Sequence, residues 1–327
     1  FLYHNSHPYL RGNYMNTEKI TFEEAIKEYK KFLLLKRKKS SIRSINNRID
    51  NYILPYFRNY YVDELTIKKY INWQTIIEEK GFQYSYKSTL HTCFVTFLNY
   101  CIKFYSLNKN VASIVGNFKN HEIKKKEIIW NIDEFNQFIK VVDNITYNVL
   151  FKLFYFTGLR EGEALALTWE DIDLNNNYIY INKTATRFFD KKGNRIMNNP
   201  KTEKSNRIIS IDNKLERELK DLKSYYKNKY NKFNEKFFVF GGTKTIPATT
   251  LTRYKNKYCD LANVNRIAIH KLRHSHAILL YQNNVPIDEI SNRLGHSKIS
   301  MTTDCYLKYL PKNEKNVITT LNSLRLN

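Results

Sequence analysis

Apolar residues recur every three or four positions through residues 19–118, which is the periodicity of amphipathic helices. Thr21 and Glu24 have the spacing of a capping box at the start of the first helix. A second helix is expected up to Pro55, a third over residues 66–79 before Gly81, and a fourth through residues 90–101. The pattern therefore predicts a small bundle made only of helices.

From residue 130 onward the pattern mixes helical and strand periodicity. Asn131 and Glu134 predict a helix start, and the apolar run 148–156 predicts a helix that ends at Gly158. Short strands are expected within 175–183, 206–210 and 237–242, with a turn at Gly193. From residue 248 the pattern is helical again. The predicted class is α+β, an N-terminal helical bundle followed by a mainly helical domain with a small antiparallel sheet.

The segments between these regions set the expected boundaries. Residues 1–18 are irregular and form an N-terminal tail, and 119–129 is a lysine-rich stretch without apolar period that serves as a linker. The domains are then 19–118 and 130–311, and 312–327 is a C-terminal helix with an apolar stripe. The irregular start at Phe1 favours the loss of an upstream module.

The net charge of the chain indicates which class of molecule it binds. The 327 residues carry 54 Lys and Arg against 31 Asp and Glu, a net charge of +23, and such an excess attracts nucleic acid. The cysteines form no CxxC pair, so neither a zinc ribbon nor a disulfide framework is expected. Apolar runs stay below the roughly 18 residues that span a bilayer. We expect a cytoplasmic protein without cofactors.

Residues 270–277, HKLRHSHA, raise a choice between a metal and an anion. His270 and His274 share one helix face, a spacing that can bind zinc. Lys271 and Arg273 lie beside them, and such cations oppose a divalent metal. A grip on a phosphate is favoured, with Arg273 as its forked donor. His274 and His276 are expected to be structural.

Further candidates for a phosphate-binding site lie elsewhere along the chain. Arg160 stands after the glycine break of TGLREGEALAL, where backbone N–H groups at a helix start also favour an anion. Lys201 precedes a predicted strand in PKTEKSNRIIS. His296 and Tyr306 lie in LGHSKISMTTDCYLKY.

Arg160, Lys201, HKLR, LGH and the downstream tyrosine together resemble the tyrosine recombinases, the phage and transposon integrase family. The resemblance covers roughly residues 130–310 and implies that the helical bundle is a core-binding domain. By position it implies two phosphate-gripping arginines, an acidic residue that orients them, a lysine that protonates the leaving 5′ oxygen, two histidines and a nucleophile. These are Arg160, Arg273, Glu163, Lys201, His270, His296 and Tyr306.

One position departs from the family pattern. Lys308 stands two residues after Tyr306, where the family often has a histidine, and Tyr309 lies close by. Tyr306 is favoured because its distance from LGH and the preceding TTD fit the family pattern. Tyr309 stays open as an alternative nucleophile.

The resemblance implies a metal- and ATP-independent, site-specific DNA recombinase that integrates or excises a mobile element through a 3′-phosphotyrosyl intermediate. Implied partners are a double-stranded recombination site, a homotetramer on DNA, and an accessory excision or host DNA-bending factor in a bacterial or phage-type, nucleoid-associated setting. The segment 312–327 would dock on a neighbouring protomer. Alternatives are a type IB topoisomerase, a telomere resolvase and a non-catalytic architectural protein. Helices around 40–54 and 84–105 are expected to enter the major groove. Expected DNA contacts are Lys36, Arg37, Lys38, Lys39, Arg43, Lys87, Lys124, Lys125 and Lys126.

Overall fold

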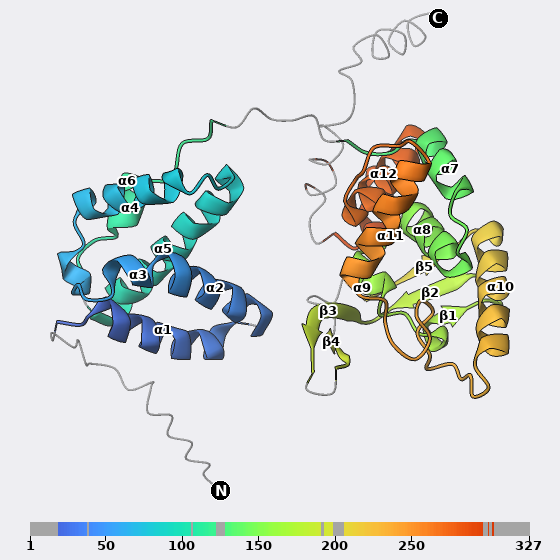
Figure 1. Cartoon of the computed structure of the whole chain (residues 1–327), viewed down its shortest axis with the longest axis horizontal. Helices are drawn as coiled ribbons and strands as arrows, with labels where there is room; N and C mark the ends of the chain where they lie inside the picture. Colours follow the sequence, from blue (N-terminus) through green and yellow to red (C-terminus); the bar gives the residue numbers. More distant parts are fainter. Residues whose placement is uncertain are drawn as a thin grey trace, which may run out of the picture. The chain divides into compact units, whose positions relative to one another are not determined.

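The computed structural model describes residues 19–37, 39–105, 107–121, 128–190, 193–198 and 206–296, together with positions 300 and 303. The chain divides into two compact units, residues 1–125 and 126–327 (Figure 1). The predicted C-terminal helix over 312–327 lies outside the described residues, as does most of the predicted linker.

The first unit is entirely helical in the part that the structure describes. Thr21 forms the predicted capping box with Glu24 at the start of the first helix, and Pro55 sits in the first turn of a separate short helix. The proline thus begins an element as well as ending the previous one, because its missing N–H is no loss in a first helical turn. The elements are α1 (Phe22–Lys36), α2 (Lys39–Tyr52), α3 (Leu54–Phe57), the 3-10 turn η1 (Val62–Glu64), α4 (Ile67–Glu79), α5 (Tyr84–Tyr105) and α6 (Val111–Val115).

Aromatic rings fill the centre of this bundle. Phe94 of α5 is fully buried and meets Phe57 at 5.4 Å, Tyr70 at 5.3 Å and Trp73 at 5.1 Å between ring centroids. These pairs are edge-to-face, an arrangement that the ring quadrupole favours by about 0.5–1.5 kcal/mol each. The helices α3 and α4 therefore converge on α5.

The second unit surrounds α8 with helices and a small sheet. Asn131 and Asn144 cap the first two helices, and Gly158 ends the second in a left-handed conformation, as predicted. The elements are α7 (Ile132–Lys140), α8 (Ile145–Thr157), α9 (Glu161–Ala164), the 3-10 turn η2 (Trp169–Asp171), β1 (Ile172–Asp173), β2 (Tyr178–Ile181), β3 (Thr184–Phe189), β4 (Arg195–Asn198), β5 (Arg207–Ser210), α10 (Asn213–Lys229), α11 (Ala248–Leu261), α12 (Ile269–Gln282) and α13 (Ile287–Leu294).

The strands form two antiparallel sheets. One has the order β1-β2-β5, with Ile179 of β2 opposite Ile209 of β5 and both side chains buried. The other is the hairpin β3–β4, which turns near Gly193 and extends from the first sheet in Figure 1. The sequence indicated the turn but not the two strands that flank it.

The strand predicted over residues 237–242 is wrong. Phe238 makes only isolated bridges, to Thr168 and to Gly242. Gly241 and Gly242 have φ angles of 123° and 73°, so the backbone turns back instead of extending. Val239 and Phe240 are nevertheless buried, which explains the apolar run.

Candidate active site

The turn after α8 places the first predicted catalytic arginine. Gly158 has a φ of 66°, and a Cβ there would lie 2.6 Å from the Leu294 side chain and 2.7 Å from the His276 ring. Both the left-handed backbone and the lack of space require glycine at this position. The close approach presses the start of α9, with Arg160 as its N-cap, against α12 and α13.

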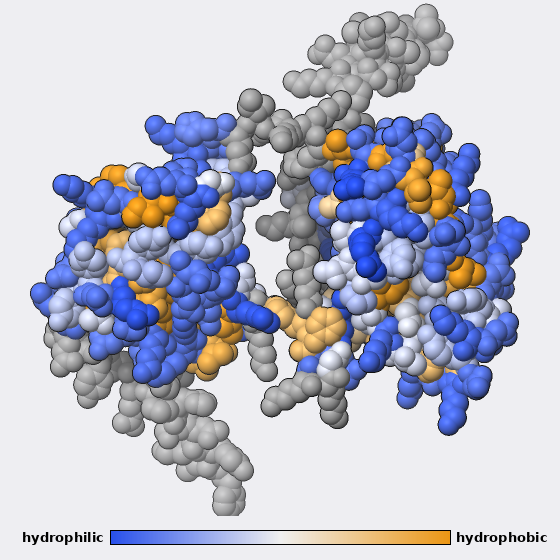
Figure 2. All heavy atoms as spheres, viewed as in Figure 1, coloured by the Kyte–Doolittle hydropathy of each residue, from blue (hydrophilic) through white to orange (hydrophobic). Residues whose placement is uncertain are grey.

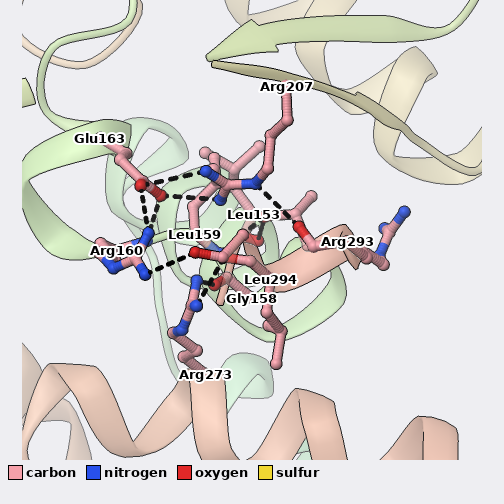
Figure 3. A network of polar contacts seen from close by, with 11 residues as sticks. Leu153, Gly158, Leu159, Arg160, Glu163, Arg207, Arg273, Arg293 and Leu294 are labelled. Carbon is pink, nitrogen blue, oxygen red and sulfur yellow. Dashed lines mark hydrogen bonds and ion pairs between the residues drawn. The ribbon is translucent and has the colours of Figure 1, made fainter. Parts of the chain in front are cut away.

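Glu163 gathers two arginines from opposite sides (Figure 3). Its carboxylate accepts hydrogen bonds from Nη1 of Arg160 at 2.7 Å and from both terminal nitrogens of Arg207 at 3.1 and 2.9 Å. Glu163 is 5% exposed. Burial raises the pKa of this carboxyl, but the hydrogen bond and charge of Arg207 and the charge of Arg160 outweigh it and bring the pKa to about 2. Glu163 is therefore a permanent anion at neutral pH.

One backbone N–H at this helix start already has an anionic partner within the chain. The N–H of Arg160 donates to Oε2 of Glu163 at 2.9 Å. The Arg160 side chain is 41% exposed, so its guanidinium is accessible to a phosphate.

Arg273 is fixed by backbone carbonyls instead of a carboxylate. Its Nη1 donates to the Gly158 carbonyl at 2.8 Å and its Nη2 donates to the Leu294 carbonyl at 2.6 Å. Arg160 donates from Nη2 to the next carbonyl, that of Gly295, at 3.1 Å. The two arginines thus come from different elements and converge on the same end of α13, as Figure 3 shows.

His296 follows directly on this anchored segment. Gly295 ends α13 with a φ of 67° and turns the chain so that His296 is half-buried. Burial, and then the charges of Arg273 and Arg160, lower the pKa of His296 to about 4. The ring is therefore neutral at pH 7 and can donate or accept one hydrogen bond. His270 is exposed on the first turn of α12, with its ring centroid 5.6 Å from that of His274.

His276 differs from His270 and His296 because it is buried and bonded on both ring nitrogens. It is 2% exposed, its Nδ1 lies 2.9 Å from the Tyr155 carbonyl, and its Nε2 accepts a hydrogen bond from Nε of Arg293 at 3.1 Å. Burial and the Arg293 charge lower its pKa to about 3. The side chain is a neutral link between α8 and α13, consistent with the structural role that the sequence suggested.

Two predicted residues cannot be placed in this geometry. Lys201 and Tyr306 lie outside the described residues. The described part of the site therefore consists of Arg160, Glu163, Arg273, His270 and His296. Within the residues that the structure describes, no cluster of His, Cys, Asp or Glu could hold a metal ion.

The sequence profile of the Phage integrase family matches residues 130–312, the region that holds all these side chains. The chain belongs to this family. It is a tyrosine-type site-specific recombinase, an enzyme that cleaves and rejoins DNA strands. Among the readings that the sequence left open, the non-catalytic DNA-binding protein, the topoisomerase and the telomere resolvase are not favoured.

Curated relatives extend the similarity beyond the matched region. A tyrosine recombinase XerC-like protein of Caldanaerobacter subterraneus subsp. tengcongensis is 28% identical over 282 residues, covering 80% of this chain and 71% of the relative. The ICEBs1 integrase of Bacillus subtilis is 26% identical over 284 residues, covering 84% of this chain and 76% of the relative. Both alignments are longer than the catalytic region alone.

Solved structures of integrases share the fold. The Tn1549 transposon integrase in complex with a circular intermediate DNA matches with a TM-score of 0.73 and 15% identity, covering 92% of this chain and 99% of the other. A lambda integrase tetramer bound to a Holliday junction matches with a TM-score of 0.65 and 16% identity, covering 89% and 78%. The mainly helical α+β class predicted from the sequence is confirmed.

Sequence reasoning about this integrase missed two arginines at the site. Arg207 precedes the buried Ile209 by two positions in β5, so strand alternation places it on the inward face. Arg293 donates from Nη1 to the Ser210 carbonyl and from Nη2 to the Phe156 carbonyl, both at 3.1 Å. Strand parity could have indicated Arg207, but the sequence gives no sign of the distant carboxylate with which it pairs.

The structure describes the side chains of some of the residues expected to contact DNA. Lys36, Arg37 and Arg43 are exposed around the junction of α1 and α2, where a phosphate could reach them. The side chain of Lys87 is 11% exposed and forms an ion pair with Glu78, and its contact with DNA stays a prediction. Lys38, Lys124, Lys125 and Lys126, and the side chain of Lys39, lie outside the described residues. Among the described helices, none is long and apolar enough to cross a membrane.

Proposed function

We propose that Tyr306 attacks a backbone phosphorus within a recombination site and forms a 3′-phosphotyrosyl bond while the P–O5′ bond breaks. Lys201 donates the proton that the leaving 5′ oxygen takes up. The phosphotyrosyl ester preserves the energy of the broken bond, so the 5′-hydroxyl of a partner strand can reverse the step without ATP. Integration or excision of a mobile element would follow from two such exchanges.

One observation carries this proposal: Arg160 and Arg273 converge on the carbonyls that end α13, directly beside His296. Negative charge develops on the non-bridging oxygens as the phenol attacks, and fixed donors stabilise it without having to reorganise. Arg160 remains 41% exposed and can still offer a face of its guanidinium to a phosphate. His270 and His296 would supply further hydrogen bonds to the same oxygens.

The nucleophile needs the same positive surroundings. A free tyrosine has a pKa of about 10, so its phenolate is scarce at neutral pH. Cations beside the hydroxyl lower that pKa and favour the attacking form. Glu163 would then keep Arg160 correctly oriented without neutralising the whole cluster, because Arg207 shares its charge.

The helical unit would hold the DNA duplex. A net charge of +23 supports binding to phosphates, and Lys36, Arg37 and Arg43 are the exposed basic residues that we propose for the first contacts. We further propose that residues 19–118 form a core-binding domain, 130–311 the catalytic domain and 119–129 the linker between them. Base contacts from α2 or α5 would select the site.

We also propose how the protein assembles and how its direction is controlled. The similar lambda integrase is seen as a tetramer on a Holliday junction, and we propose that this chain also recombines as a homotetramer, with an excision or DNA-bending factor setting direction in the nucleoid. Residues 312–327 would dock on a neighbouring protomer. If a chain that ends before Lys312 assembles and cuts DNA like the full chain, this part of the proposal is wrong.

The central test traps the covalent intermediate. DNA that the full chain selects by binding is nicked near the cleavage position. It is incubated with the protein in the presence of a chelator that removes divalent metal ions, and the products are separated on a denaturing gel. Wild-type protein should give a slowly migrating protein–DNA adduct. Tyr306→Phe should give none while retaining DNA binding in a gel-shift assay, because only the attacking oxygen is removed.

Tyr309→Phe is the matched control, since it removes a hydroxyl three positions away and should keep the adduct. An adduct that persists in Tyr306→Phe and disappears in Tyr309→Phe would move the nucleophile to Tyr309. No adduct from the wild-type protein on any selected site would overturn the proposed chemistry itself.

A further inference from the structure

Arg207 lies at the start of β5 and was not among the predicted catalytic residues. Its side chain is 7% exposed and both terminal nitrogens donate to Glu163. Its Nε donates to the Arg293 carbonyl at 2.8 Å. One side chain therefore connects β5 with α9 on one side and with the end of α13 on the other (Figure 3).

The packing around Gly295 reinforces the second connection. A Cβ at Gly295 would lie 3.1 Å from Cδ and Nη1 of Arg207, closer than most real Cβ contacts. The glycine thus permits the arginine to lie against the turn that leads to His296. The position of this turn depends on the side chain that covers it.

We propose that Arg207 is a positioning residue that fixes the distance between Arg160 and His296. It holds Arg160 through Glu163 and holds the His296 turn through the Arg293 carbonyl and Gly295. The inference rests on the proposed function, because the distance matters only if both groups contact one phosphate.

The guanidinium is required because it donates in several directions at once. Arginine presents five N–H donors on a rigid plane, whereas lysine has a single ammonium on a flexible stem. Arg207→Lys keeps the positive charge but cannot pair with both Glu163 oxygens and the Arg293 carbonyl. Arg207→Gln also removes the charge. The two substitutions therefore separate geometry from electrostatics.

An ordinary buried ion pair would stabilise the fold without affecting the reaction, so the test needs a readout that stability does not move. The charged groups bonded to Glu163 are Arg160 from α9 and Arg207 from β5, with Arg273 of α12, Arg293 of α13 and His296 nearby. Burial raises the pKa of Glu163, and without Arg207 this effect is less opposed. Protonated Glu163 would release Arg160.

The experiment measures single-turnover adduct formation on nicked DNA from pH 5 to pH 8. We expect Arg207→Gln to be about a hundredfold slower than wild type at pH 8, and to lose further activity toward pH 5 more steeply than wild type. Arg207→Lys keeps the positive charge, so it should show a slope close to that of wild type, with a smaller loss at pH 8. Glu163→Gln and the double variant Arg207→Gln/Glu163→Gln should both lack the extra slope, because the titrating carboxyl is gone. The double variant should lose less activity than the two single losses combined, because the contact through Glu163 is shared.

Lys152→Gln is the structural control. It breaks the Lys152–Glu218 ion pair between α8 and α10, whose side chains are 19% and 20% exposed, away from the arginines. We expect it to lower the melting temperature without changing the adduct rate. Losses that add in the double variant, or an Arg207→Gln pH profile parallel to wild type, would overturn the positioning role. Wild-type protein without adduct would instead overturn the proposed function.

Discussion

Among the described residues, the helical unit buries one polar or charged side chain, Asn110, whereas the catalytic unit buries Glu163, Asp171, Glu216, Lys255, Arg273 and His276 together with several hydroxyls. Asn110 is itself a helix cap that donates to the Val95 carbonyl at 3.0 Å. The helical unit is thus held together almost entirely by apolar and aromatic packing. The catalytic unit folds around charges that most small domains keep outside.

The difference has a physical reason. Burying a charge costs several kcal/mol unless partners compensate it. Asp171 accepts from the Thr168 backbone at 2.7 Å and pairs with Lys183 at 2.6 Å, and Glu163 is shared by two arginines. A reaction on a phosphate needs cations that do not move, and buried partners fix them. The helical unit keeps its charged groups at the surface, and its outer face in Figure 2 is largely hydrophilic.

The sharpest way to break this contrast is to remove a buried cation from the site. Arg273→Gln should reduce adduct formation about a thousandfold, because the fixed donor to the transition state is lost. Arg217→Gln, on the exposed face of α10, should leave the rate unchanged. Single-turnover gels compare the two, and equal rates for Arg273→Gln and wild type would show that the buried charge serves stability alone.

Lowering the pH should destabilise the catalytic unit more than the helical unit. The folded pKa of His276 is about 3, below its ordinary value of 6.5. A histidine with a depressed pKa contributes stability that is complete above the unfolded pKa and is lost as pH falls toward the folded one. Between pH 7 and pH 5 the catalytic unit should lose about 2 kcal/mol from this group.

Amide hydrogen exchange of the full chain at both pH values measures this effect, with α12 and α5 as reporters. In the helical unit, burial also lowers the pKa of His91, but that ring is only partly buried and bonds to the Tyr70 hydroxyl, so α5 should change less. His276→Gln should reduce the pH effect in α12, and the lowered pKa of His296 accounts for part of what remains. Equal acid sensitivity of both helices would contradict the contrast between the units.

Helix caps should show the smallest effects and no difference between units. The side chains of Thr21 and Asn131 each accept a hydrogen bond from the backbone N–H of the glutamate three residues on. The carboxylate of that glutamate accepts a hydrogen bond from the capping residue's own backbone N–H. Thr21→Ala and Asn131→Ala should each cost about 1 kcal/mol. Exchange at the first turns of α1 and α7 provides the measurement, and a much larger loss for Asn131 would indicate that its cap also supports the charged site.

The sequence by itself determined the features that depend on neighbouring residues. Thr21 with Glu24, Asn131 with Glu134, and Gly158 after its apolar helix each define a helix end through contacts within a few positions. The order from Arg160 to Tyr306 also lies in the sequence, and it carried the family resemblance. Strand 237–242 failed because Gly241 and Gly242 turn the chain against Lys244 and Tyr230, which strand periodicity does not register.

Tertiary structure alone decided which charges meet. Arg207 is 44 positions from Glu163 and 86 positions from Arg293, so no local pattern joins them. The convergence of Arg160 and Arg273 on the end of α13 likewise depends on how α8, α12 and α13 pack around Gly158. Local hydrogen bonds and apolar periodicity fix the elements, whereas long-range burial fixes the electrostatics, because a charge can enter the interior only where the complete fold supplies its partners.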